Sequence, residues 1–257
     1  MEQMRDLQMS ELLKLAIEQK RIPRYLYKYT TIENAIKALE NGTVYFAQFS
    51  EFNDEYEGFA KLDTNISIND WLSFFVQNGI FGWNAWLLAN TVINDPRGAS
   101  KIVKTVIEES QKKNGFLCLS TRPNSILMWA HYTNQNKGCC LEYDLLADTQ
   151  LFNHIKKIDY DDNTIVYNYL RNQGGALEAM FHKSKQWEYE DEYRVIWINN
   201  HGVRKVNDSC LTRVIVGPQF QQNSDENKTK LKDLTPVNKL YKAVKGDNPK
   251  VFDIKPF

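Results

Sequence analysis

A charged segment that leads straight into an apolar run constrains this chain more than any other feature. Its charged part is Glu190-Asp191-Glu192-Tyr193-Arg194, and an apolar stretch of four residues follows it. In a β-strand alternate side chains share a face, so we expect Glu190, Glu192 and Arg194 to point the same way. Two carboxylates and a guanidinium are costly to desolvate without a ligand or mutual pairing. The segment therefore predicts a strand that carries a functional site.

A second informative block is Met128-Trp129-Ala130-His131-Tyr132, in a predicted helix over residues 125–132. On a helix Trp129 and Tyr132 lie three residues apart and share a face, whereas His131 points elsewhere. The functional interpretation is a hydroxyl and an imidazole at the rim of a pocket. The structural alternative is a buried aromatic cluster in which His131 holds a backbone carbonyl.

Polar residues in a predicted turn form a third candidate. Asn53 and Asp54 are followed by Glu55 and Glu57, and such oxygen ligands suit a divalent cation. Their spacing is not that of an EF-hand loop, and the alternative is a capped turn. We therefore keep Asn53 and Asp54 as candidate binding residues.

Composition and motifs exclude several classes of function. The 32 basic residues balance 32 acidic ones, so no global field draws the chain to nucleic acid or to a membrane. The four histidines form no HxH or HxxxH pair, which disfavours zinc, and we expect no metal. Neither a Walker A loop nor a Gly-x-Gly-x-x-Gly motif occurs. The start lacks the apolar run of a signal peptide and the cysteines form no CxxC pair, so we expect a cytoplasmic protein.

The order of apolar patterns predicts a single α+β domain over residues 1–257, with small mixed or antiparallel sheets flanked by helices. Residues 1–24 are expected to be an N-terminal helical extension of the domain at 25–257. Further helices are predicted over 32–41, across most of 66–113, and over 163–185 with an interruption at Gly174-Gly175. The tail over 221–232 is polar and is expected to be loose.

Seven segments in order resemble the bacterial DUF2971 family, a group named for its unknown function. They cover residues from about 25 to 218, and the chain departs at Glu55, where the family pattern leads us to expect proline. The matching segments are Leu26-Tyr27-Lys28-Tyr29, Leu39-Glu40-Asn41-Gly42, Phe52-Asn53-Asp54, Cys118-Leu119-Ser120, Met128 to Tyr132, Lys137-Gly138, and the series Lys183, Trp187, Glu190, Glu192 and Arg194.

The stretch from Leu26 to Gly42 also resembles, more remotely, the ADP-ribosyltransferase fold. The likeness lies in an aromatic-flanked strand, a Thr-capped helix and an Asn-Gly stop. It implies that Lys28 takes the place usually held by His or Arg, whose hydrogen-bond geometry Lys does not copy. Enzymes of this fold also carry a functional Tyr or Ser in the middle of the chain, a place that Ser120 or Tyr132 would take here. They carry the catalytic Glu at the start of a late strand, a place that Glu192 or Glu190 would take.

The resemblance implies an NAD-binding protein, either an ADP-ribosyltransferase or an NAD glycohydrolase, with a toxin-like or host-defence role. NAD would be its substrate, no metal would be needed, and the acceptor would be a protein or a nucleic acid. Catalytic roles fall to Glu192, Glu190 and Tyr132, with Trp129 or Tyr132 stacking on nicotinamide. Arg194 would orient the glutamates, and Lys28 would meet a phosphate. Substrate-binding roles fall to Lys28, Tyr29, Ser120, Trp129, His131, Lys183, Trp187, Arg194, Asn53 and Asp54.

Two alternatives from other classes stay open. One is a non-catalytic module whose aromatic and charged pocket binds a nucleotide or a partner protein. The other is a metal-dependent hydrolase that uses Asp54, Glu57, His131 and Glu190. The first predicts binding without turnover, and the second predicts loss of activity with a chelator.

Overall fold

The computed structural model describes residues 2–54, 60–62, 66–163, 165–167, 170–171 and 175–257. Helices and strands alternate along the chain, which confirms the α+β fold class. The chain forms two compact units. Unit 1 comprises Met1–Ala47, Gly115–Ile158 and Gln186–Phe257, and unit 2 comprises Gln48–Asn114 and Asp159–Lys185. The expectation of one domain over 1–257 stays a prediction.

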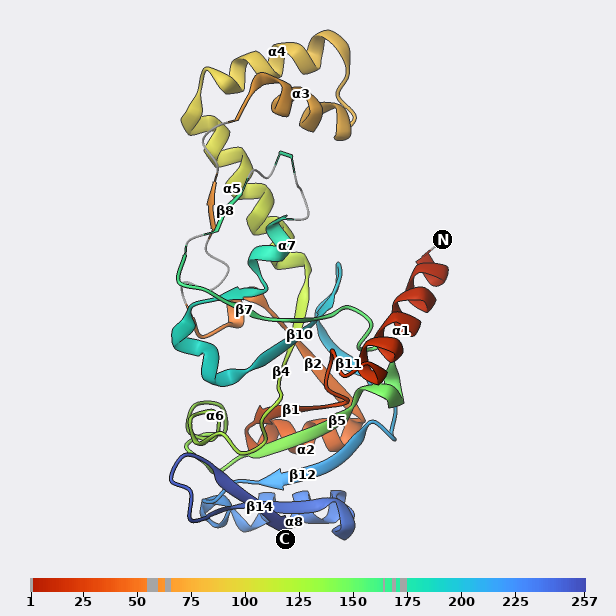
Figure 1. The fold of residues 1–257 in the computed structure, drawn as a ribbon, viewed down its shortest axis with the longest axis vertical. Helices are drawn as coiled ribbons and strands as arrows, with labels where there is room; N and C mark the ends of the chain where they lie inside the picture. Colours follow the sequence, from red (N-terminus) through yellow and green to blue (C-terminus); the bar gives the residue numbers. More distant parts are fainter. Residues whose placement is uncertain (1, 55–59, 63–65, 164, 168–169, 172–174) are drawn as a thin grey trace. The chain divides into compact units, whose positions relative to one another are not determined.

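Unit 1 is built on one large sheet rather than several small ones (Figure 1). The strand order is β11-β2-β4-β1-β5-β12-β13-β14, and β10 pairs with both β4 and β6. Strands β12 and β13 run parallel, whereas β5 runs antiparallel to both β1 and β12. The strands are β1 (Tyr25–Thr30), β2 (Thr43–Gln48), β4 (Gly115–Ser120), β5 (Cys139–Asp144), β6 (Ile155–Lys157), β10 (Glu192–Trp197), β11 (Gly202–Lys205), β12 (Leu211–Val216), β13 (Leu240–Lys245) and β14 (Phe252–Pro256).

The last residue of β4 joins two parts of this sheet. Strand β4 pairs with β10 along its whole length, whereas its register with β1 contains the single pair Ser120 and Tyr27. Strand β1 pairs with β5 along its whole length. Ser120 therefore lies between Tyr27 of β1 and Glu192 of β10.

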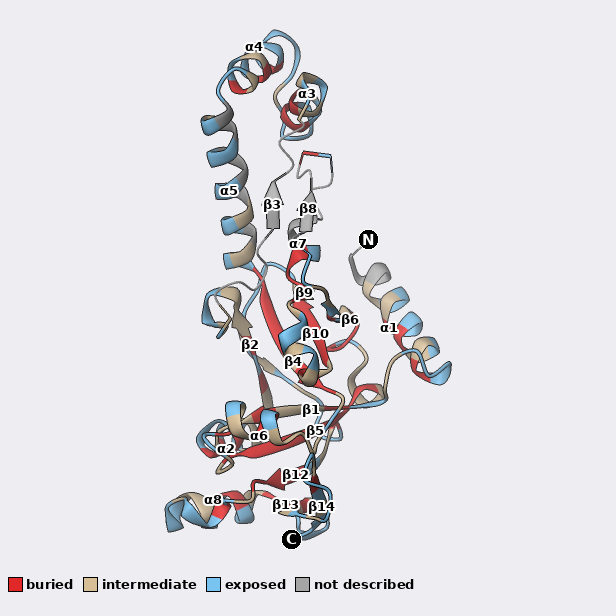
Figure 2. Cartoon of the chain, turned by 60° about the vertical axis from the view of Figure 1, so that its left-hand side comes forward, coloured by how far each residue is buried: buried red, intermediate tan, exposed pale blue. Residues whose placement is uncertain are grey.

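Helices cover both faces of the unit 1 sheet. The face that carries Leu26 and Leu141 packs against α1 (Glu2–Glu18), α2 (Ile32–Asn41) and α8 (Asp225–Leu234). The face that carries Tyr29 and Cys140 packs against α6 (Ile126–Tyr132). Figure 2 shows buried residues concentrated along β4, β5, β10 and β12. Short 3-10 helices complete the unit: η2 (Leu145–Asp148), η3 (Lys185–Glu190), η4 (Phe220–Gln222) and η5 (Val237–Lys239).

Local sequence determines both ends of α2. The Thr31 hydroxyl accepts a hydrogen bond from the Asn34 backbone N–H at 3.4 Å, which caps the first turn. Gly42 closes the helix at φ +56°, a left-handed conformation that glycine adopts without a Cβ penalty. The predicted boundaries of this helix are confirmed.

Unit 2 contains α3 (Ile68–Gln77), α4 (Gly82–Ile93) and α5 (Pro96–Lys113), which confirms the predicted helical segment over 66–113. Trp71, Phe74 and Phe75 of α3 pack against small and β-branched residues of α4. Two short parallel strand pairs and two short helices complete it: β3 (Ala60–Leu62) with β8 (Ile165–Tyr167), β7 (Asp159–Tyr160) with β9 (His182–Lys183), α7 (Gly175–Ala179) and η1 (Phe49–Glu51).

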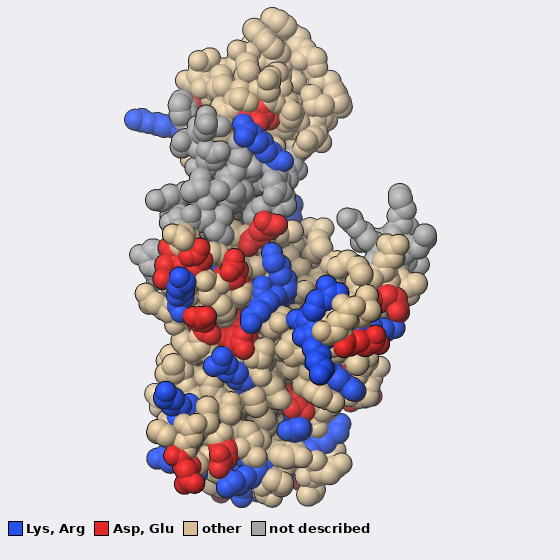
Figure 3. Space-filling view, in the orientation of Figure 1, with Lys and Arg blue, Asp and Glu red and all other residues tan. Residues whose placement is uncertain are grey.

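The α3–α4 hairpin carries no charged residue after Asp70, near the start of α3, and it is partly exposed. From Trp71 to Asn94 the sequence contains no Asp, Glu, Lys or Arg. Trp83 is 69% exposed and stacks on Trp86 with ring centroids 4.7 Å apart. Figure 3 accordingly shows an almost uniformly uncharged surface over these two helices.

Two secondary-structure predictions are wrong. The helix expected over 163–185 reduces, in the described part of that range, to the five residues of α7 between short strands. The tail expected to be loose contains α8, which begins at the Ser224 cap and buries Leu231. One buried leucine among polar residues gave no helical periodicity. No helix in the described ranges is long and apolar enough to cross a membrane.

Gly138 permits the close approach of β1 and β5. A Cβ atom at Gly138 would lie 2.2 Å from the Thr30 carbonyl oxygen and 3.0 Å from the Thr133 Cβ. Because Thr30 contributes backbone there, relief requires movement of the strand rather than of a side chain. We expect Gly138→Ala to lower the free energy of unfolding by about 2–3 kcal/mol, measured by urea denaturation.

Gly202→Ala is the comparison for this prediction. Gly202 has φ +90°, and no atom of the described residues lies within 4 Å of the position that a Cβ would occupy. The substitution therefore introduces backbone strain of about 1 kcal/mol without a clash. A loss at Gly138 no larger than that at Gly202 would contradict the predicted clash.

Candidate functional site

The candidate site begins where β4 ends and β10 starts. Ser120 and Glu192 are paired in register, as are Cys118 and Arg194, so these four side chains share one face of the sheet. The Ser120 hydroxyl donates to the Glu190 carbonyl oxygen at 2.6 Å and accepts from the Arg122 N–H at 3.1 Å. Ser120 thus fixes the turn that precedes β10.

Glu192 and Arg194 form a buried bidentate ion pair. Arg194 Nε donates to Glu192 Oε1 at 2.7 Å, and Arg194 Nη2 donates to Glu192 Oε2 at 3.0 Å. Glu192 is 4% exposed and Arg194 is 1% exposed. Two parallel bonds fix the plane of the carboxylate as well as its distance. The arrangement agrees with the expectation that Arg194 orients a glutamate.

Glu190 is held from a different element. It is the last residue of η3, and Asp191 follows it at φ +42°. The prediction that Glu190 lies on the same strand as Glu192 is therefore wrong, because the strand begins only at Glu192. The Tyr132 hydroxyl of α6 donates to Glu190 Oε1, and Glu190 is 2% exposed.

Asp191 stabilises the turn between the two glutamates. Its carboxylate accepts from the Thr121 hydroxyl, lies 2.9 Å from Lys157 Nζ, and lies 3.6 Å from Arg122 Nε. Partial burial by itself would raise the pKa of Asp191. The hydrogen bonds from Thr121 and Lys157 outweigh this effect and hold the pKa below its usual value.

Aromatic side chains line the outer side of this cluster. His131 Nδ1 lies 2.8 Å from the Tyr189 hydroxyl oxygen, and the Trp187 and Tyr189 ring centroids are 6.0 Å apart. His131 is exposed, whereas Tyr132, Trp187 and Tyr189 are half-buried. The structure therefore brings His131, Tyr132 and Trp187 together and adds Tyr189, which sequence reasoning missed.

Tyr29 and Trp129 belong to the core instead. Their rings meet edge to face with centroids 5.3 Å apart, and Trp129 is 0% exposed. Trp129 Nε1 donates to the Pro123 carbonyl at 2.9 Å, and the Tyr29 hydroxyl donates to the Arg122 carbonyl at 2.6 Å. Burial raises the pKa of Tyr29. Trp129 has no accessible face, which corrects the expectation that it stacks on a ligand.

Lys28 is not brought to the cluster. Side chains alternate along β1, and Tyr27, not Lys28, is the residue paired with Ser120. Lys28 pairs with Leu141 and shares a face with Leu26. It therefore projects from the face opposite to Ser120 and Glu192, which corrects the expectation that it meets a phosphate there.

The remaining predicted residues lie in unit 2. Lys183 is buried in β9, Asn53 is exposed after η1, and Asp54 is half-buried. Among the residues that the structure describes, no three His, Cys, Asp or Glu side chains gather closely enough to hold a metal ion. Glu57, which belongs to the metal-hydrolase hypothesis, lies outside the described residues.

A further buried carboxylate lies beside the site and was missed by sequence reasoning. Glu142 of β5 is 2% exposed and accepts from the Tyr27 hydroxyl at 2.8 Å and from the Thr212 hydroxyl at 2.6 Å. Arg213 Nε lies 3.2 Å from its Oε1. Burial, reinforced by the bond to Glu142, raises the pKa of Tyr27. The hydroxyl partners of Glu142 come from β1 and β12, so no pattern within β5 itself reveals this arrangement.

Glu190 and Glu192 are two buried carboxylates, each fixed in orientation by a directed donor, and they lie beside an accessible aromatic edge. Such an arrangement is suited to stabilising positive charge that develops on a bound molecule. No family model, curated protein or solved structure matches this chain. The site must therefore be interpreted from its own geometry.

Tyr132→Phe tests the contact between α6 and η3. It removes one donor from a carboxylate that is almost fully buried, and a hydrogen bond to a charged group contributes about 1.5–3 kcal/mol. We expect the free energy of unfolding to fall by about 2 kcal/mol in urea denaturation. Tyr25→Phe, at an exposed position, should change it by less than about 0.5 kcal/mol. Equal effects of the two variants would contradict the assigned bond.

Asp191→Asn tests the electrostatic support of the turn. A carboxylate whose pKa is lowered in the folded state stabilises the protein above its unfolded pKa of about 3.9. This contribution is lost as the pH falls through the folded pKa. We expect the variant to be less stable than the parent by about 0.5–1 kcal/mol at pH 7, with a smaller difference at pH 3.

Asp247→Asn, at an exposed position, is the control for this pH series. Its stability difference from the parent should be close to zero at both pH values. A difference at Asp191 that did not diminish in acid would show that the charge of Asp191 is not what stabilises the turn.

Proposed function

We propose that the chain binds NAD or a related nucleotide beside Glu190 and Glu192 and cleaves its nicotinamide–ribose bond. One observation carries the proposal. Ser120, Tyr132, Glu190 and the Glu192–Arg194 pair, which come from four elements, converge at one end of β10 beside accessible aromatic side chains. The ADP-ribosyltransferase resemblance implies the same chemistry, whereas the DUF2971 resemblance implies no particular reaction. Both resemblances stay predictions.

Glu192 would act on the ribose. A ribose hydroxyl would donate to the Glu192 carboxylate, whose two oxygens also accept from Arg194. As the glycosidic bond breaks, nicotinamide leaves with the bonding electron pair and the sugar gains oxocarbenium character. The fixed negative charge of Glu192 stabilises that transition state. An acceptor oxygen then bonds to the sugar carbon and releases its proton.

The positions that bind the rest of the nucleotide differ from those expected. Because Trp129 is buried, a flat ring would stack on Trp187 or Tyr132. Because Lys28 lies on the other face of β1, phosphates would meet Arg122 and Lys157, whose side chains are 56% and 54% exposed. Both cations lie at the turn beside Glu192. Water, a protein or a nucleic acid would be the acceptor.

A non-catalytic recognition module is the second candidate function. Its support is that Arg194 already engages both oxygens of Glu192 and that Tyr132 engages Glu190. A self-paired network of this kind serves equally well as a rigid frame for an aromatic binding edge. This candidate requires saturable binding of a nucleotide or a partner without turnover.

The deciding experiment follows nicotinamide release from NAD by the purified chain, with or without Glu192→Gln. The substitution keeps the shape and removes the charge, so we expect a fall in rate of roughly a hundredfold or more. Glu188→Gln, at an exposed position of η3, is the matched control and should keep the parent rate. Circular dichroism and thermal unfolding establish that both variants fold.

The possible outcomes separate the two candidates. Full activity of a folded Glu192→Gln variant would exclude the assigned carboxylate. Absence of nicotinamide release from the parent, together with saturable nucleotide binding in a thermal-shift titration, would favour the recognition module. Absence of both release and nucleotide binding would reject the proposed NAD chemistry.

A further inference from the structure

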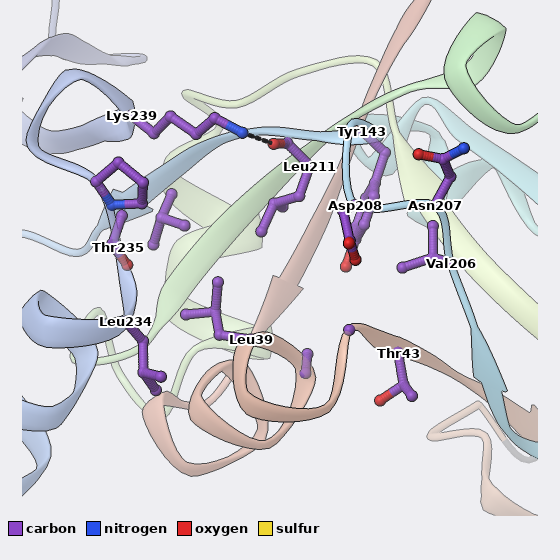
Figure 4. A pocket seen from close by; sticks show the side chains of 14 residues that line it. Leu39, Thr43, Tyr143, Val206, Asn207, Asp208, Leu211, Leu234, Thr235 and Lys239 are labelled. Carbon is purple, nitrogen blue, oxygen red and sulfur yellow. Dashed lines mark hydrogen bonds between the residues drawn. The ribbon is translucent and has the colours of Figure 1, made fainter.

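A cavity of about 190 Å³ lies in unit 1, and none of its lining residues belongs to the candidate site. Helix α2, the β11–β12 connection, α8 and η5 contribute its walls (Figure 4).

Tyr143 gives this cavity a polar group without a partner in the described part of the chain. The residue is 2% exposed, and its backbone is fixed by pairing with Leu26 on one side and Leu211 on the other. Its hydroxyl makes no hydrogen bond to any residue that the structure describes, and its side chain lines the cavity. The cavity therefore offers a phenolic O–H group that can donate to or accept from a bound molecule.

Two opposite charges also line the cavity. Asp208 is an exposed residue of the β11–β12 connection that lines the cavity, and it has no ion-pair partner among the described residues. Lys239 of η5 donates one hydrogen bond from Nζ to the Leu211 carbonyl at 2.7 Å, which leaves two N–H donors. Figure 4 shows Lys239 and Asp208 extending from different sides. One anionic and one cationic side chain together match a zwitterion, a ligand that carries one positive and one negative group and has no net charge.

The remaining walls are apolar and limit the size of the ligand. Leu39, Leu211 and Leu234 lie along the cavity and suit a hydrocarbon group. A volume near 190 Å³ is smaller than the roughly 300–1,000 Å³ of drug-sized pockets. It is somewhat larger than the roughly 150 Å³ cavity that admits benzene. The space therefore suits one ring or one branched chain.

We propose that this cavity binds a small zwitterion with an apolar side group, of the size of a branched-chain or aromatic amino acid. The ammonium group bonds to Asp208 and to the Tyr143 hydroxyl. The carboxylate bonds to the free N–H groups of Lys239. The apolar group lies between Leu39 and Leu234. The inference is independent of the proposed NAD chemistry.

Probes that share one carbon skeleton test the charge pattern. L-phenylalanine, phenethylamine and 3-phenylpropanoate differ only in which charged groups they carry, and L-leucine tests a smaller apolar group. We expect isothermal titration calorimetry to detect binding of at least one of the two amino acids. We also expect each singly charged probe to bind at least tenfold more weakly than phenylalanine, or not at all if leucine alone fits.

Two outcomes would overturn the proposal. One is that neither amino acid binds at millimolar concentration. The other is that phenethylamine or phenylpropanoate binds as tightly as the better amino acid, because one of the two charged contacts would then contribute nothing. Glu192→Gln should leave amino-acid binding unchanged, so failure here is distinguishable from failure of the NAD proposal.

Substitutions of cavity-lining residues test whether the amino acid binds in this cavity. Asp208→Asn should weaken amino-acid binding at least tenfold, whereas Asp233→Asn, at an exposed position outside the cavity, should not. Tyr143→Phe should also weaken binding. Because no described residue bonds to the Tyr143 hydroxyl, its removal should leave the thermal midpoint of the unliganded protein unchanged or higher. Undiminished binding to both Asp208→Asn and Tyr143→Phe would place the ligand elsewhere.

Discussion

The double pairing of Ser120 is the constraint on which the rest of unit 1 depends. At this residue β4 adjoins β1 on one side and β10 on the other, and the Ser120 hydroxyl also ties down the carbonyl of Glu190. A one-residue slip of β4 against β10 would exchange the faces of Glu192 and Tyr193. The position of the Glu192–Arg194 pair, of the Tyr132 contact and of the aromatic edge therefore follows from one strand register.

The buried carboxylates show how the two parts of the sheet carry charge with little destabilisation. Glu192 is neutralised by a residue two positions away on the same strand, so the pair forms as soon as β10 is extended. Glu142 and Glu190 instead depend on tyrosines supplied by other elements, β1 and α6. The Glu192–Arg194 pair therefore forms within one strand, whereas the Tyr27–Glu142 and Tyr132–Glu190 bonds form only when separate elements are correctly packed.

Much of the fold could be predicted from the sequence, because local signals agree with the tertiary structure there. The Thr31 cap, the Asn41-Gly42 stop and the alternating apolar runs of β1 and β4 determined their elements directly. The Glu190 to Arg194 cluster was found because charge beside an apolar strand is unusual. The alternation of side chains along a strand also predicts that Lys28 and Tyr27 lie on opposite faces of the sheet. Tyr189, Glu142 and the division into two units depend on long-range pairing that composition and spacing do not encode.

The two interruptions of unit 1 fall at related places in its sheet. The chain passes from unit 1 into unit 2 after β2 and returns at β4, and these two strands are neighbours in the sheet. It passes into unit 2 again after β6 and returns just before β10, which is the antiparallel partner of β6. Each intervening segment thus behaves as a long connection between adjacent strands, and lengthening such a connection costs little closure entropy. The sheet can therefore tolerate extensive variation in the length and content of unit 2 during evolution while its own pairing stays intact.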